Sequence, residues 1–226
     1  MRIDANGLHF SVLDKAVRNA ADREIIIDNC IGQRYIGSGL SGKNVVINGT
    51  PGNALGAYLN GADITVHGNV QEATGDTMNG GEIVVYGSAG DATGYAMRGG
   101  KIFVEGDVGY RCGIHMKAYR ENKPAIVIGG RTGSFLGEYQ AGGIIIVLGD
   151  SLGEKPVIGN FCGTGMHGGE QVKAERLERL PEGEAAQLVR EWCAKFGKDS
   201  EKYLNCIYYR LTPDSANPYK QMYTQN

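Results

Sequence analysis

This chain of 226 residues has four histidines that could bind a metal or act as acids and bases: His9, His67, His115 and His167. No two of them have the short spacing that protein metal ligands usually show. None is flanked by carboxylates in the arrangement of a base with its orienting partner. The sequence therefore predicts no metal site and no catalytic constellation.

Two glycine clusters, at residues 37–42 and 163–168, match the spacing G-x-G-x-x-G. Such a motif binds a dinucleotide when it follows a strand and opens a helix, because the phosphates then meet the helix N-terminus. Here another β-type run at residues 44–47 follows the first cluster, and both clusters fall in step with a longer repeat. We interpret them as turns of that repeat and not as a nucleotide site.

The five cysteines show no Cys-x-x-Cys spacing. Cys112 and Cys162 stand at the same place in two copies of the repeat, two copies apart. At the usual spacing of neighbouring strands they would lie roughly 10 Å from each other, which is too far for a disulfide. We expect buried, apolar thiols with no redox or iron–sulfur role.

Most of these residues, though not His9, Cys193 and Cys206, belong to a repeat that runs from Glu24 to Gly169. Short β-type runs are closed by glycines at a step of 19 residues: Gly49, Gly68, Gly87 and Gly106. A second glycine series starts with the same step and loosens at its end: Gly37, Gly56, Gly75, Gly94, Gly113, Gly137 and Gly163. Leu or Met stands three residues after these glycines, except at Gln140. We expect the second series to be structural.

A period of this size with β-type runs predicts an all-β solenoid, in which each coil buries its apolar side against its neighbours. We expect about seven coils. Alternate residues of a strand point to opposite faces, so pairs such as Ile64/Val66 and Ile102/Val104 should fill the interior and leave no cavity. Asn29 replaces the closing glycine of the first copy, and asparagine tolerates a positive φ.

The outward position of each run is also mostly apolar, although Thr65 interrupts it: Ile26, Val46, Val84, Phe103 and Ile146. An exposed apolar stripe needs a cover, either the terminal helices of the chain or another protein. Two insertions, at residues 119–123 and 151–156, also break the period and carry Arg120 and Lys155. Our candidate partner contacts are Val46, Val84, Phe103, Ile146, Arg120 and Lys155.

The flanks of the repeat predict helices. Residues 1–23 contain a capping helix that Ser11 can begin, with Val12, Leu13 and Val17 on its apolar face. Residues 170–226 contain an amphipathic helix that ends at Gly197, a further helix at 199–208 and an extended end. The resulting boundaries are 1–23 for the cap, 24–169 for the solenoid and 170–226 for the helical extension.

Composition limits the possible partners. The net charge is −2, so no basic patch for nucleic acid or an anionic membrane is expected. Glycine accounts for 36 residues. No apolar run of about 18 residues and no signal peptide is evident. We expect a cytoplasmic protein.

The repeat from Gly80 to Gly94 resembles the G-x-G-x-G β-helix domain that closes the large subunit of glutamate synthase. The flanking segments 33–37 and 217–220 are similar to the stand-alone form of that domain, found where the enzyme is divided into separate polypeptides. The resemblance implies a single-stranded, right-handed parallel β-helix without an active site or cofactor of its own. It also implies partners: a class II glutaminase subunit and a synthase subunit that binds FMN and an iron–sulfur cluster.

The same repeat is similar to the β-helix subunit of formylmethanofuran dehydrogenase, which also has no catalytic centre, and this is the alternative reading. A solenoid hydrolase or lyase would instead need acids and bases repeated on one outer face. The outward positions before the closing glycines hold a mixture: Asn48, His67, Tyr86, Glu105 and Leu148. We therefore expect a scaffold subunit, and self-association stays open.

Overall fold

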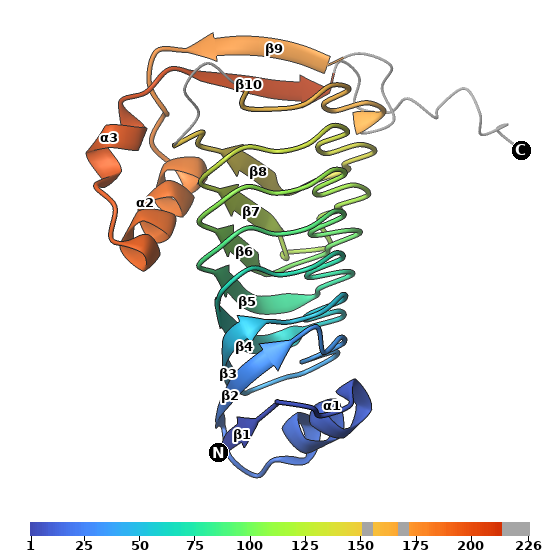
Figure 1. The fold of residues 1–226 in the computed structure, drawn as a ribbon. Helices are drawn as coiled ribbons and strands as arrows, with labels where there is room; N and C mark the ends of the chain where they lie inside the picture. Colours follow the sequence, from blue (N-terminus) through green and yellow to red (C-terminus); the bar gives the residue numbers. More distant parts are fainter. Residues whose placement is uncertain (151–155, 167–171, 214–226) are drawn as a thin grey trace, which may run out of the picture.

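Eight parallel strands stacked in chain order form one long sheet along the molecule (Figure 1). The computed structural model describes residues 1–150, 156–166 and 172–213. The strands are β1 (Arg2–Asp4), β2 (Glu24–Ile31), β3 (Asn44–Thr50), β4 (Asn60–His67), β5 (Gly80–Val85), β6 (Lys101–Val104), β7 (Ala125–Ile128) and β8 (Ile144–Val147). The predicted parallel solenoid of about seven coils is confirmed.

The strands pair in register, so equivalent side chains of successive coils form columns. Ile64 pairs with Ile83, Ile83 with Ile102, and Ile102 with Ile126. These inward side chains are completely buried, as the alternation predicted. A second column of single bridges, from Val70 through Ala89, Val108 and Thr132 to Ile158, joins the coils on another face.

The second glycine series lies where the chain turns most tightly. All seven glycines have a φ between +63° and +72°, a backbone region that L side chains avoid. Space is also restricted, because a Cβ on Gly75 would lie 2.5 Å from Cδ1 of Ile102 on the next coil. Glycine is therefore needed here both for the backbone and for the approach of the isoleucine column.

Each coil also places non-glycine residues in the left-handed region, which the sequence analysis did not predict. Ala73 and Thr77, two residues before and after Gly75, have φ values of 56° and 50°. Asn29 has a φ of 55°, so the positive φ predicted there is confirmed. Its alignment with the closing glycines is not, because the register shifts after Ile27 and Gly49 pairs with Cys30.

The first end of the solenoid is closed by β1 and by helix α1 (Phe10–Asn19) (Figure 1). The short strand β1 was not predicted. The helix is capped by His9, whose Nδ1 accepts a hydrogen bond from the backbone N–H of Ser11, so the assignment of Ser11 as the cap was wrong. Leu13 and Val17 are buried as expected, but Val12 is exposed.

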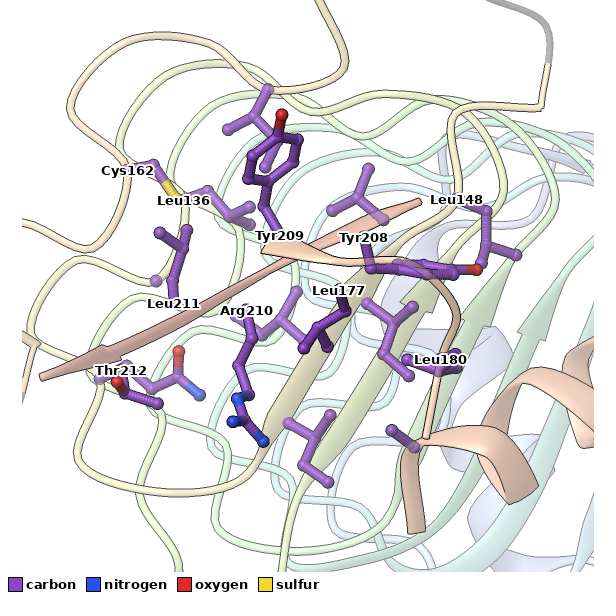
Figure 2. A pocket seen from close by; sticks show the side chains of 18 of the residues that line it. Leu136, Leu148, Cys162, Leu177, Leu180, Tyr208, Tyr209, Arg210, Leu211 and Thr212 are labelled. Atoms are coloured by element: carbon purple, nitrogen blue, oxygen red, sulfur yellow. The ribbon is translucent and has the colours of Figure 1, made fainter. Parts of the chain in front are cut away.

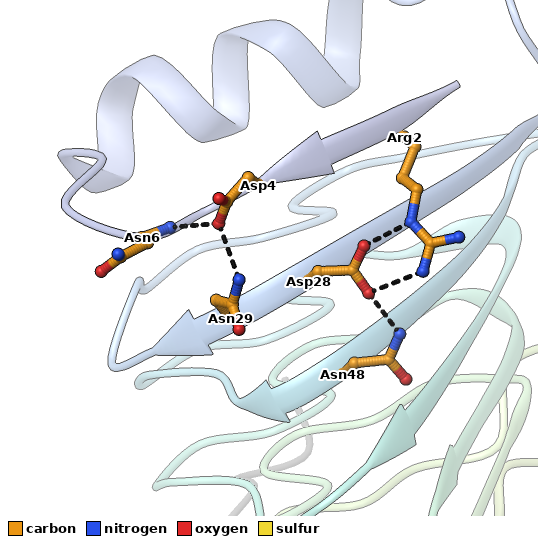
Figure 3. A network of polar contacts seen from close by, with 6 residues as sticks. All are labelled: Arg2, Asp4, Asn6, Asp28, Asn29 and Asn48. Atoms are coloured by element: carbon orange, nitrogen blue, oxygen red, sulfur yellow. Dashed lines mark hydrogen bonds and ion pairs between the residues drawn. The ribbon is translucent and has the colours of Figure 1, made fainter.

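Polar side chains fasten β1 to the next coils (Figure 3). Arg2 donates hydrogen bonds to both carboxylate oxygens of Asp28, and Asn48 on β3 donates to the same carboxylate over 2.7 Å. Asn29 donates to Asp4 over 3.0 Å. The hydrogen bonds from Arg2, first, and from Asn48 lower the pKa of Asp28.

The chain beyond the last coil forms β9 (Val172–Leu177), α2 (Glu184–Phe196), α3 (Ser200–Leu204) and β10 (Tyr208–Pro213). The strands β9 and β10 pair in antiparallel fashion across the second end of the solenoid, while α2 and α3 lie beside the sheet (Figure 1). Gly197 ends α2 in a left-handed conformation, as predicted. The helix predicted at residues 199–208 is shorter than expected: α3 ends at Leu204, and β10 begins at Tyr208.

We expect Gly75→Ala to lower the free energy of unfolding by about 2–3 kcal/mol, through backbone strain together with overpacking against Ile102. Chemical denaturation of the purified chain measures this value.

Gly39→Ala is the matched control. Gly39 has a φ of +64°, but no atom lies within 4 Å of a Cβ placed there, so only the backbone cost of about 1 kcal/mol is expected. Equal losses for the two variants would contradict a packing role for Gly75.

Candidate functional site: the outer face of the sheet and its open end

Helix α2 covers the outer face of β5 to β8. Its buried residues Leu188, Val189 and Trp192 belong to one apolar cluster with the outward side chains of these strands, which are Val84, Phe103, Val127 and Ile146. The indole Nε1 of Trp192 donates a hydrogen bond to the carbonyl of Val104 over 2.9 Å. A Cβ on Gly129 would lie 2.3 Å from Trp192, so this glycine leaves the room that the indole fills.

Ion pairs hold α2 along the direction in which the strands stack. Nζ of Lys195 lies 2.5 Å from the carboxylate of Glu82 on β5, and Nζ of Lys101 on β6 lies 2.6 Å from Glu191. The hydroxyl of Tyr86 donates to the carbonyl of Lys195 at the end of the helix. The helix thus runs from β8 back to β5 and ends there.

This arrangement corrects three predicted partner contacts. Val84, Phe103 and Ile146 are 6%, 0% and 7% exposed beneath α2, so the helix of the same chain occupies the place assigned to another protein. The sequence left both alternatives possible, because an apolar stripe does not show whether the segment that covers it belongs to the same chain or to another protein.

The remaining predicted contacts have different surroundings. Val46 is half-buried on the part of the sheet that α2 does not reach, together with Ile26 and Thr65. Arg120 is exposed, and its guanidinium lies 5.2 Å from the ring centroid of Tyr119. Lys155 lies outside the described residues.

An apolar cavity of about 700 Å³ lies between the last coil and the antiparallel pair of strands β9 and β10 (Figure 2). The expectation of a completely filled interior is therefore wrong at this end. Ile145 and Val147 on β8 are only half-buried, because the antiparallel pair β9–β10 stands where a further coil would cover them. Their counterparts in the preceding coil, Ile126 and Ile128, are fully buried.

Gln140 lines this cavity, at the one place where the Leu and Met series fails. Its side-chain nitrogen donates to the carbonyls of Gly142 and Gly143, over 3.3 and 3.2 Å. The amide therefore satisfies two backbone acceptors at the end of the stack, where a methionine could not.

The cysteines and the described histidines have structural environments, while His167 lies outside the described residues. His115 stacks on Tyr139 with a centroid distance of 5.2 Å, and His67 lies 4.9 Å from Tyr86. All five cysteines are free. Within the described ranges, no group of three or more His, Cys, Asp or Glu side chains could hold a metal ion.

Burial raises the pKa of three thiols well above the usual value. The pKa reaches about 12 for Cys112 and about 11 for Cys30 and Cys193. Since the thiolate is the reactive form, these groups stay protonated and inert near neutral pH.

The helices that the structure describes include none with the length and apolar character needed to cross a bilayer.

Comparison with known proteins agrees with this architecture. A family model described as the GXGXG motif matches residues 11–199, which include the coils and α2. The chain belongs to the GXGXG motif family. The chain is also similar over nearly its whole length to a protein of Methanocaldococcus jannaschii described as uncharacterised. The two are 41% identical over 251 residues, covering 98% of this chain and 95% of the relative.

The GXGXG fold also matches a solved structure with a TM-score of 0.62 and 20% sequence identity. This structure is the formyltransferase/hydrolase complex FhcABCD of Methylorubrum extorquens, crystallised with methylofuran. The match covers 94% of this chain and 88% of that chain. At this level of identity, the likeness concerns the fold alone.

Removing the indole should detach α2 from the sheet. We expect Trp192→Ala to lower the stability of the docked helix by about 3–5 kcal/mol, because a large buried side chain leaves a cavity. Hydrogen exchange resolved by segment measures this as faster exchange in α2.

Trp192→Phe is the companion variant. The carbonyl of Val104 keeps the hydrogen bond from the backbone N–H of Gly129, so the lost indole bond should cost only about 0.5–1.5 kcal/mol. Exchange in β3 and β4 should not change in either variant. Equal acceleration of all strands would show instead that α2 and the solenoid unfold as one unit.

Thiol labelling tests the burial of the cysteines. At about pH 8, iodoacetamide should modify the exposed Cys206 first, while Cys30, Cys112 and Cys193 react only after denaturation. Mass spectrometry of digested samples identifies the modified positions.

Cys206→Ser should remove the rapid labelling and serves as the control. Rapid modification of Cys112 in the native protein would contradict a closed interior.

Proposed function

We propose that this chain is a non-catalytic structural subunit of a glutamate synthase-type complex. In this role it braces a glutaminase subunit against a synthase subunit that carries FMN and an iron–sulfur cluster. The observation that carries the proposal is the match of the GXGXG motif family over residues 11–199. The repeat from Gly80 to Gly94 also resembles the β-helix domain of the large glutamate synthase subunit.

The physical character of the molecule supports a bracing role. A solenoid with in-register aliphatic columns is stiff along its axis, because each coil contacts its neighbours over its full width. Its long outer faces then offer separate surfaces to two partners at a fixed distance. Glutamine hydrolysis and the reductive step would take place in the partner subunits, between which ammonia passes.

A second candidate function is a scaffold role in a formyl-transferring assembly, like that of the β-helix subunit of formylmethanofuran dehydrogenase. The observation in its favour is the fold match to the FhcABCD complex. The solenoid would again be structural, but the reaction of the assembly would be formyl transfer or hydrolysis.

Isolation of the native complex distinguishes the two. A tagged copy expressed in the source organism should co-purify with a flavin- and iron-containing protein, and the complex should form glutamate from glutamine and 2-oxoglutarate. The chain alone should show no turnover.

Co-purification of a molybdenum or tungsten protein with formyl-transfer activity would support the second candidate instead. Turnover by the isolated chain would contradict both.

A further inference from the structure

The outer face of the sheet is only half covered. Helix α2 has 13 residues, which span about 20 Å at 1.5 Å per residue. Four strands at their usual spacing extend about 19 Å, so α2 is long enough for β5 to β8 and no further. The same face continues without interruption over β4, β3, β2 and β1 (Figure 1).

The uncovered half repeats the pattern on which α2 docks. Register pairs Ile26 with Val46, Val46 with Thr65, and Thr65 with Val84, so one outward row leads directly under the helix. Ile26, Val46 and Thr65 are half-buried, with no helix above them among the described residues. The row therefore changes from fully covered to open at β5, where α2 ends.

The charges beside this row indicate which side chains a helix that covers it would need. Asp63 pairs in register with Glu82, the carboxylate that receives Lys195 of α2. Asp63 is exposed, and among the described residues no cation lies within ion-pair distance of it. The carboxylate of Glu24, one strand beyond Asn44 in the same row, accepts a hydrogen bond from Asn44 and has no described lysine or arginine partner. Within Glu24, the N-terminal ammonium of Met1 bonds only to the backbone carbonyl, over 2.7 Å.

The structure points to a docking site for a second helix in line with α2. We infer that an amphipathic helix from a different subunit lies over Ile26, Val46 and Thr65, and that it places lysine or arginine side chains against Asp63 and Glu24. This inference rests on the proposed role as a subunit of a complex and names the surface that the role uses.

A second copy of the chain fits this face less well. Two such faces carry the same carboxylates, Glu24 and Asp63, so they lack the opposite-charge pairing that Lys195 and Glu82 make under α2, and like charges at an interface disfavour association. Arg2 does not offset them, since it is already paired with Asp28. The chain's own α1 packs at the end of the solenoid (Figure 1).

The test uses the full chain co-expressed with the subunits that co-purify with it. A zero-length carbodiimide cross-linker should join Asp63 or Glu24 to a lysine in a helix of another subunit. Asp63→Lys and Glu24→Lys should each weaken subunit binding about tenfold. Exchange of the cross-linked lysine for glutamate in the partner should restore binding to Asp63→Lys.

Glu72→Lys is the matched control. Glu72 is exposed and accepts a hydrogen bond from Asn53 over 2.8 Å, much as Glu24 accepts one from Asn44 over 2.6 Å, but it lies outside this row. The control should bind partners with unchanged affinity.

A complex that assembles with full affinity in both variants, without cross-links from Asp63 or Glu24, overturns the docking site and leaves the proposed function intact. Cross-links to a second copy, or to Lys220 of the same chain, overturn the assignment of the helix to another subunit. If the chain is isolated without any other subunit, the proposed function fails and the docking site fails with it.

Discussion

The contact between isoleucine columns and left-handed glycines lets coils that are held at a fixed spacing by backbone hydrogen bonds close around their core, and the rest of the molecule depends on it. A Cβ on Gly94 would lie 2.4 Å from Cδ1 of Ile126, and one on Gly113 would lie 2.4 Å from Cδ1 of Ile145. The backbone can therefore approach the next isoleucine only where a side chain is missing. Repetition of this contact keeps the strands in register, so the outward residues also form continuous rows.

At each end of such a stack, the terminal coil has no further coil to pair with, and the two ends of this chain are covered in different ways. At the first end, β1 adds a strand and α1 covers the interior, while Arg2, Asp28 and Asn48 bond across three strands. At the second end, the antiparallel strands β9 and β10 cross the last coil and leave an apolar cavity beneath them. The second end is accordingly less well packed, as the half-buried Ile145 shows.

The outer face connects the fold to the proposed role. An apolar row on a flat sheet attracts an amphipathic helix, and α2 shows the geometry of such docking, with an indole at its centre and lysine–carboxylate pairs at its margins. Because the row continues in register past the end of α2, the helix of this chain covers only part of a longer outer surface. A scaffold subunit needs surfaces of this kind, because its contribution to a complex consists of the positions in which it holds its partners.

The sequence alone determined the features that repeat locally. The step between glycines, the burial of pairs such as Ile64 and Val66, the left-handed Asn29 and the end of α2 at Gly197 all follow from alternation, spacing and the conformational range of single residues. These signals lie within one coil or one helix, and every coil repeats them.

Only the tertiary structure decided how distant segments meet. Trp192 bonds to Val104, which lies 88 positions earlier, so no local pattern identifies α2 as the cover of Val84, Phe103 and Ile146. The candidate surface was thus only partly predictable: its apolar row was visible, but its division at β5 was not. Strand β1, the β9–β10 pair and the cavity likewise belong to the ends, where the repeat stops and burial depends on the segment of the chain that packs there.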